Sequence, residues 1–148
     1  MKERERETKK ICVVFDTNVL VSALLTTNSL SPTAQIVSSL FKGILIPLYN
    51  DKVIEEYHDV LHRKHFNFDS KTVEELINTV KEVGLNIKST VKSDEIFPDK
   101  DDIVFYEVRM SVDDSYLVTG NLKHFPRKPF VVTPTQMVEI LKEMNLIS

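Results

Sequence analysis

The sequence of 148 residues contains a single cysteine, Cys12, which excludes an internal disulfide. One cysteine fits a reducing cytosol, so we expect a cytoplasmic protein. The longest apolar runs are far shorter than the roughly 20 residues that cross a bilayer, and no membrane partner is expected. The first ten residues are almost all charged and lack the apolar segment of a signal peptide.

The sequence also lacks internal repeats, low-complexity tracts and Gly/Ser-rich linkers. With 42% hydrophobic and 28% charged residues it has the composition of an ordinary globular chain, long enough for a hydrophobic core. We therefore predict a charged N-terminal arm over residues 1–9 and a single domain over residues 10–148. The net charge of −3 gives no overall attraction to nucleic acid, so such a partner requires a local basic patch.

Apolar residues recur in a pattern that predicts strands alternating with helices. Short apolar runs predict strands at 11–15, 44–49, 116–120 and 130–132, with a shorter strand at 85–88. Helical spacing and capping residues predict helices between these strands and after the last one. Pro47 favours an edge position or a bend for its strand. The alternation indicates an α/β fold with a parallel sheet and right-handed crossovers.

Asp16 stands where the first predicted strand ends and a helical pattern begins. In parallel α/β sheets, ligands bind just outside the carboxyl ends of the strands, so Asp16 is placed at the expected functional edge. The alternative is that Asp16 only caps the following helix, which aspartate does well.

Further acids are predicted at the same edge of the sheet. Glu55 and Glu56 lie early in the helix after the second strand, and Asp99, Asp101 and Asp102 precede another helix. Crowded carboxylates repel each other unless a cation neutralises them. Mg²⁺ or Mn²⁺ does so with oxygen ligands, and such an ion can activate water and brace a phosphate. The alternative is that these acids simply favour helix N-termini.

Four segments of the chain together resemble the motifs of PIN domains, over about residues 10–133. PIN domains are metal-dependent ribonucleases, many of them VapC-type toxins of bacterial toxin–antitoxin pairs. Each motif is weak alone, whereas the ordered set of four is more specific. The segments are Phe15–Leu24, Glu56–Leu61, Asp99–Phe105 and Tyr116–Asn121.

The resemblance implies a three-layer α/β/α sandwich with a central, mainly parallel sheet. It also implies that Asp16, Glu56 and Asp102 hold one Mg²⁺ or Mn²⁺ for the hydrolysis of single-stranded RNA. Asp99 is a candidate for positioning the attacking water. The expected partners are the RNA substrate, an antitoxin protein and a second copy of the chain.

The chain departs from the family pattern at Asn121, where many PIN domains have aspartate. An asparagine carbonyl is a neutral metal ligand, so the departure bears on a second metal and on full activity. Asn18 and Thr119 are predicted to orient ligands or water around the metal. Their alternative roles are a helix-start amide and a strand-end threonine.

Two groups of basic or imidazole side chains remain. One helix face is expected to carry His58, His62 and His65. These histidines could form a zinc site or belong to a solvated face that contacts RNA phosphates, and the solvated face is favoured. Lys123 and Arg127 follow Asn121 and are predicted to contact phosphates, with a plain solvated loop as the alternative.

Two other functions are weighed. A haloacid-dehalogenase-type phosphatase also begins with a strand that ends in aspartate, but it needs a second acid two residues later, where this chain has Asn18. A non-catalytic PIN-like module that binds RNA or protein is favoured by Asn121.

Overall fold

The computed structural model describes residues 9–148, so the predicted arm over residues 1–9 lies outside the described residues except for Lys9. The strands are β1 (Ile11–Phe15), β2 (Leu45–Tyr49), β3 (Leu85–Asn86), β4 (Ser115–Val118) and β5 (Val131–Val132). The α-helices are α1 (Thr17–Leu25), α2 (Pro32–Phe41), α3 (Asp51–Leu61), α4 (Ser70–Val83), α5 (Ile103–Met110) and α6 (Pro134–Glu143). Two short 3₁₀ helices are η2 (Lys100–Asp102) and η3 (Leu122–His124).

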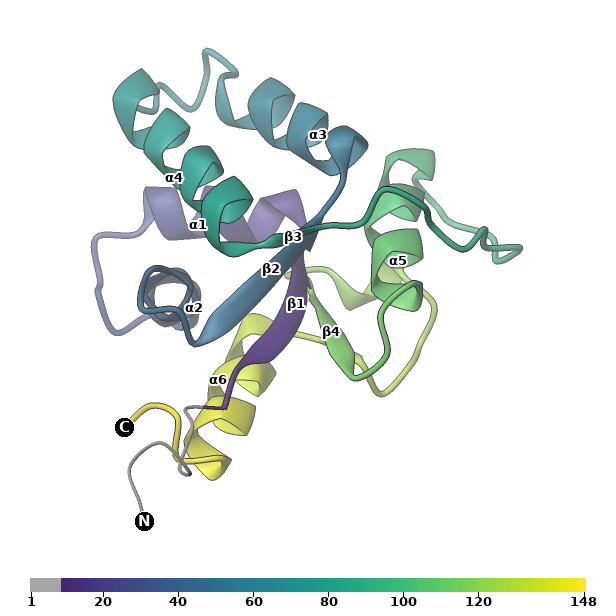
Figure 1. Cartoon of the computed structure of the whole chain (residues 1–148). Coiled ribbons are helices and arrows are strands. Elements are labelled where there is room, and N and C mark those ends of the chain that lie inside the picture. The colour runs from purple at the N-terminus through teal and green to yellow at the C-terminus, as the bar shows by residue number, and fades with distance from the viewer. Residues whose placement is uncertain (1–8) are drawn as a thin grey trace.

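The strands form a five-stranded parallel sheet in the order β3-β2-β1-β4-β5, which confirms the predicted α/β/α fold. The chain moves from β1 outward to β3 and then returns to β4 on the other side of β1, so the strand order reverses between β1 and β4. Right-handed crossovers therefore place α5 and α2 on opposite faces. α5 packs against β1 and β4, whereas α2 packs with α6 (Figure 1). A crevice at such a reversal is the usual ligand site of α/β sheets.

The helices α2, α3 and α6 begin where their capping residues predict. Ser31 accepts a hydrogen bond from the backbone N–H of Ala34, and Asn50 accepts one from Val53. Thr133 and Gln136 form a reciprocal capping box at the start of α6. Each cap satisfies an N–H group that the helix itself leaves unpaired, so the strand-to-helix junctions are locally encoded.

The edge position predicted for the strand that contains Pro47 is wrong, because β2 lies between β3 and β1. The ladder to β3 pairs only Leu48 and Tyr49, and it begins one residue after Pro47. Gly84 approaches just before β3, where a Cβ atom would overlap the carbonyl oxygens of Pro47 and Val80. The inner strand β2 therefore accommodates the proline, because β3 pairs with β2 only from Leu48 onward and a glycine without a Cβ atom lies against Pro47.

The core lies around the two central strands. Val13, Val14 and Phe15 of β1 and Leu117 and Val118 of β4 are fully buried. Burial of each such side chain stabilises the fold by about 1.5–3 kcal/mol, so these strands hold their carboxyl ends rigidly. Among the described residues, no helix is both long and apolar enough to cross a membrane.

Candidate active site

Asp16 lies at the end of β1, against the end of β4. Its backbone N–H donates to the Val118 carbonyl over 3.0 Å, and the Thr119 hydroxyl donates to Asp16 Oδ2 over 2.7 Å. The same hydroxyl accepts a hydrogen bond of 3.0 Å from the backbone N–H of Asn121. Asp16 and Thr119 are both buried. The carboxylate of Asp16 is thus oriented by β4 and by the turn that follows it.

The helix-cap alternative for Asp16 finds little support. Its side chain makes no capping hydrogen bond of normal geometry to α1, although the N–H groups of Thr17 and Asn18 lie near enough to favour its charged form. Burial has the larger effect and raises the pKa of Asp16 above its ordinary value, against the hydrogen bond from Thr119. The buried hydroxyl of Thr17 has no hydrogen-bond partner.

Asn18 joins the start of α1 to the turn after β4. Its side-chain carbonyl accepts a hydrogen bond of 3.1 Å from the backbone N–H of Gly120. Asn18 and Thr119 therefore both connect the ends of β1 and β4. Asn18 does so from the start of α1, and Thr119 does so through its hydrogen bond to Asp16. Their predicted role in orienting ligands or water stays a prediction.

Asp102 is the second buried acid of this region, at the end of η2 and only 8% exposed. Its pKa is raised to about 6, first by burial, then by the charges of Asp16 and Asp99, while His124 acts in the opposite direction. His124 Nδ1 lies 3.2 Å from Asp102 Oδ2, within ion-pair distance, yet this oxygen has no hydrogen bond of normal geometry. Asp16 and Asp102 are thus two buried carboxylates that repel each other.

Glu56 contributes a third acid from α3. The neighbouring Tyr57 is fully buried, and its hydroxyl donates to the Phe15 carbonyl over 2.6 Å, which anchors α3 beside the end of β1. The pKa of Glu56 is raised by partial burial and then by the charges of Asp101 and Asp59. Glu55, by contrast, is exposed.

Asp99 connects the inner and the outer acids. Its charge raises the pKa of both Asp102 and Glu56. Its Oδ1 also accepts a hydrogen bond of 2.9 Å from the backbone N–H of Asp101, which caps η2 and fixes the side chain. The predicted acids therefore interact electrostatically as an inner pair and an outer group, with Asp99 as their common neighbour.

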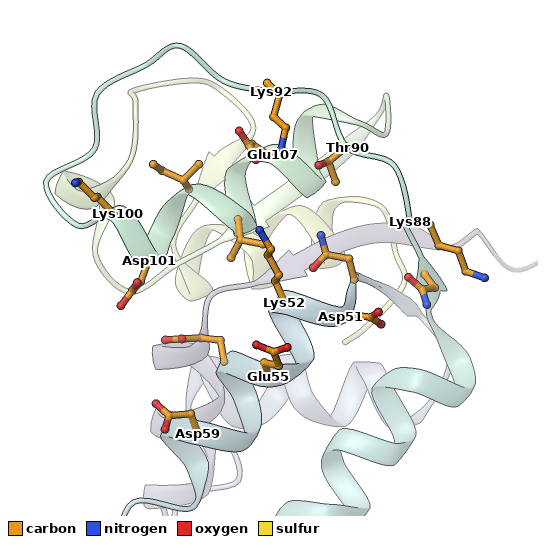
Figure 2. Close-up of a pocket in the computed structure, with 15 residues that line it drawn as sticks. Asp51, Lys52, Glu55, Asp59, Lys88, Thr90, Lys92, Lys100, Asp101 and Glu107 are labelled. Carbon is orange, nitrogen blue, oxygen red and sulfur yellow. The ribbon is translucent and has the colours of Figure 1, made fainter.

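A large open groove of about 1250 Å³ runs beside the outer acids, between α3, α5 and the segment over residues 86–92. Figure 2 shows acidic side chains gathered on α3, with Lys88, Lys92 and Lys100 on the surrounding segments. Glu56 and Asp101 belong to its lining, and Asp16 and Asp102 do not. The lining lysines are Lys52, Lys88, Lys92 and Lys100. Sequence reasoning missed this lysine set, because its members are scattered along the chain and only the fold brings them together.

A second, smaller cavity of about 380 Å³ contains the predicted phosphate contacts Lys123 and Arg127. Its lining begins at Leu122, directly after Asn121, and the same segment of the chain carries His124. The contact between His124 and Asp102 was also missed, although the position of His124 shortly after the fourth predicted motif is a signal that sequence reasoning can use.

The acids fit a divalent cation that keeps much of its water. Within residues 9–148, the set of three ligand side chains with ligand atoms within 4.8 Å of one another is His58, His62 and Glu74, not the predicted acids, and His65 is not part of it. Mg²⁺ usually binds through one or two carboxylates plus waters, so it does not need three ligands that tightly gathered. The Oδ2 of Asp102, which lacks a hydrogen bond of normal geometry, and the raised pKa values of the inner acids are what a cation would relieve.

Comparisons with known proteins agree with this reading of the fold. A protein-family model described as a PIN domain matches residues 12–123 of the chain, from β1 to η3. Neither a curated protein nor a solved structure matches the chain. The matched segment contains all four positions of the predicted acidic motifs, Asn121 included.

Proposed function

The chain belongs to the PIN-domain family, and on that premise we propose that it is an endoribonuclease that hydrolyses phosphodiester bonds of single-stranded RNA. PIN domains are generally metal-dependent nucleases. The observation that carries the proposal is the buried pair Asp16 and Asp102 at the carboxyl end of the sheet. Both pKa values are raised, and the pair lies beside the reversal of strand order where α/β proteins bind ligands.

The proposed metal ligands are Asp16, Glu56 and Asp102, with the Asn121 side-chain carbonyl as a neutral fourth. When bound, Mg²⁺ or Mn²⁺ would supply a water of lowered pKa and neutralise charge on the scissile phosphate. Thr119 holds Oδ2 of Asp16, which leaves Oδ1 for a ligand. Asp99 interacts electrostatically with Asp102 and with Glu56, and in the proposal it orients the attacking water.

The substrate strand is proposed to lie in the groove beside α3. Four lysines on its walls, set among six acidic side chains, are proposed to contact the RNA phosphates, while bound cations would neutralise the acids. Lys123 and Arg127 supply cations in the second cavity, on the segment after Asn121. We therefore propose that RNA phosphates contact both basic groups, while the acids meet the phosphate that is cleaved.

The toxin role rests on the resemblance of the four motifs to VapC-type proteins. In this proposal the protein acts in the cytoplasm, its activity slows growth, and an antitoxin protein suppresses it. Expression of the intact chain in a bacterial host should inhibit growth, and expression of Asp16→Asn should not. Normal growth during expression of an active, folded enzyme would remove the toxin role and leave the nuclease activity standing.

The nuclease proposal is tested with a mixed pool of single-stranded RNA, purified protein and Mn²⁺. Asp16→Asn should lower cleavage at least about a hundredfold, the scale observed when a key electrostatic group is lost. The control is Asp94→Asn, since Asp94 is an exposed acid on the loop before η2. Circular dichroism should be native for both variants. Cleavage by Asp16→Asn that equals the parent would refute the assignment.

The same assay decides the second candidate, a PIN-like module that binds RNA without cutting it. Asn121 favours this candidate, because it lowers the charge available to a metal by about one unit relative to aspartate. RNA binding by the parent protein with no cleavage at any Mn²⁺ concentration would establish the non-catalytic function instead.

A further inference from the structure

A second group of metal-ligating side chains lies on the outer surface, where α3 packs against α4. His58 lies on α3 and His62, one turn later, caps the end of that helix. Their rings are nearly parallel, with centroids 5.6 Å apart. Glu74 faces them from α4. Its Oε2 lies 3.6 Å from His58 Nδ1 and 3.1 Å from His62 Nε2. The group therefore joins two helices that a turn separates in the sequence.

The spacing of these atoms is that of ligands around one ion. Zn²⁺ binds imidazole nitrogen and carboxylate oxygen at about 2.0–2.2 Å in tetrahedral geometry, so neighbouring ligand atoms stand roughly 3.3–3.5 Å apart. The two distances from Glu74 bracket that value, and all three ligand atoms lie within 4.8 Å of one another. The side chains are 36–44% exposed, so small rotations can bring the two nitrogens together.

The hydrogen bond on the other side of His62 defines which nitrogen is available. His62 Nδ1 lies 2.8 Å from the backbone carbonyl of His58, and a carbonyl only accepts, so Nδ1 carries the hydrogen. Nε2 then faces Glu74 Oε2 at 3.1 Å. At that distance either a proton or a metal ion lies between the two atoms. A carbonyl that orients the far nitrogen is also the usual second contact of a metal-binding histidine.

The ligand types select the metal. Two imidazoles and one carboxylate suit Zn²⁺, whereas Mg²⁺ prefers oxygen ligands alone. Arg63 adds a positive charge nearby, but it is paired with Asp59 at 3.2 Å. Glu74 also makes this face a poor contact for RNA phosphates, which is the role that the histidines alone suggest.

We propose that His58, His62 and Glu74 bind one Zn²⁺ ion, with water in the remaining position, and that the ion joins α3 to α4. Three protein ligands plus one open position is a common zinc arrangement. Because α3 also carries Glu56, the ion would fix the helix that supplies the outer acid of the candidate active site. The site uses none of the proposed ligands of the catalytic metal, so it does not depend on the ribonuclease proposal.

Calorimetric titration of the intact protein with Zn²⁺, in excess Mg²⁺, tests the proposal. We expect one Zn²⁺ per chain in the parent protein. His62→Gln and Glu74→Gln should each weaken binding at least about tenfold, because even contacts behind a metal ligand affect affinity by 10–100-fold. His65→Gln is the matched control, since His65 is an exposed histidine on the following turn and lies outside the group. Its affinity for Zn²⁺ should equal that of the parent.

Thermal melts give a second readout that does not rely on activity. Zn²⁺ should raise the melting temperature of the parent and of His65→Gln, but not of Glu74→Gln, because the ion stabilises only the fold that it binds. Circular dichroism confirms that each variant is folded. Absence of Zn²⁺ binding in the parent would mean that the cation between His62 and Glu74 is only a proton. Binding that Asp16→Asn abolishes and Glu74→Gln retains would assign the zinc to the acidic site. Either result overturns the proposal.

Discussion

Replacement of Asp102 by asparagine should stabilise the metal-free protein. The pKa of this carboxyl is raised from 3.8 to about 6 by burial and by the charges of Asp16 and Asp99. The folded protein therefore holds the Asp102 proton more tightly than the unfolded chain does. Linkage then requires that the contribution of this group to the free energy of unfolding is greatest below about pH 4 and falls as pH rises toward 6. Above about pH 7 this contribution to the free energy of unfolding is fully lost.

The expected gain follows from that shift. About two pKa units correspond to roughly 3 kcal/mol at 1.36 kcal/mol per unit, and the access of solvent to the region lowers the value. We expect Asp102→Asn to raise the free energy of unfolding at pH 7.5 by about 1–3 kcal/mol, or its melting temperature by about 3–10 °C. At about pH 3 the variant and the parent should approach equal stability, because Asp102 is then mostly protonated in both the folded and the unfolded state.

Urea unfolding without metal, at a series of pH values from about 3 to 8, measures the effect. Asp94→Asn is the control for removal of an exposed acid, and it should leave both the stability and its pH dependence nearly unchanged. With Mn²⁺ the order should reverse, because the parent gains stability from the ion and Asp102→Asn loses a proposed ligand. Equal stability of Asp102→Asn and the parent at pH 7.5, with the same slope against pH, would refute the reasoning about buried charge.

Three further predictions concern single positions. Glu56→Gln should weaken Mn²⁺ binding in calorimetric titration while Glu55→Gln does not, and the opposite ranking would transfer the ligand role to Glu55. Asn121→Asp should lower the melting temperature without metal and enlarge its rise on addition of Mn²⁺, and an equal rise in both proteins would place Asn121 away from the ion. Gly84→Ala should lower the free energy of unfolding by about 1–3 kcal/mol in urea, because its Cβ overlaps two backbone carbonyls; an unchanged midpoint would show that β3 shifts freely.

The sequence was most informative about features that a few neighbouring residues determine. The apolar run before Asp16 identified β1, and the capping residues Ser31, Asn50 and Thr133 identified helix starts, because each pattern expresses a local hydrogen-bonding or burial need. The position of Asp16 at the carboxyl end of a strand followed from general properties of parallel sheets. These parts of the site were predictable before any coordinates.

Features that depend on distant residues were not predictable in this way. Pro47 favoured an edge position or a bend, and the edge position was wrong because sequence alone does not reveal where β3 begins to pair with β2. Glu74 escaped notice because a turn and part of a second helix separate it from His62. The lysine groove is assembled from three segments, and no periodicity along the chain signals it. The approach of His124 to Asp102 depends on the course of a turn after β4.

The bond between Tyr57 and the carbonyl of Phe15 determines how α3 is rotated about its own axis. Each residue of an α-helix advances by about 100°, so a helix that slipped by one position would point a different side chain toward β1. The tyrosine hydroxyl reaches its acceptor in one rotational setting, and that setting brings Glu56 toward the acids while Glu55 is left to solvent. Tyr57→Phe would keep the buried ring and remove only the hydrogen bond to the Phe15 carbonyl. The protein would then hold its fold through the buried Val53 and Leu61, but α3 would lose the polar contact that sets its rotation most narrowly, and the outer half of the site would lose alignment before the sheet lost any contact.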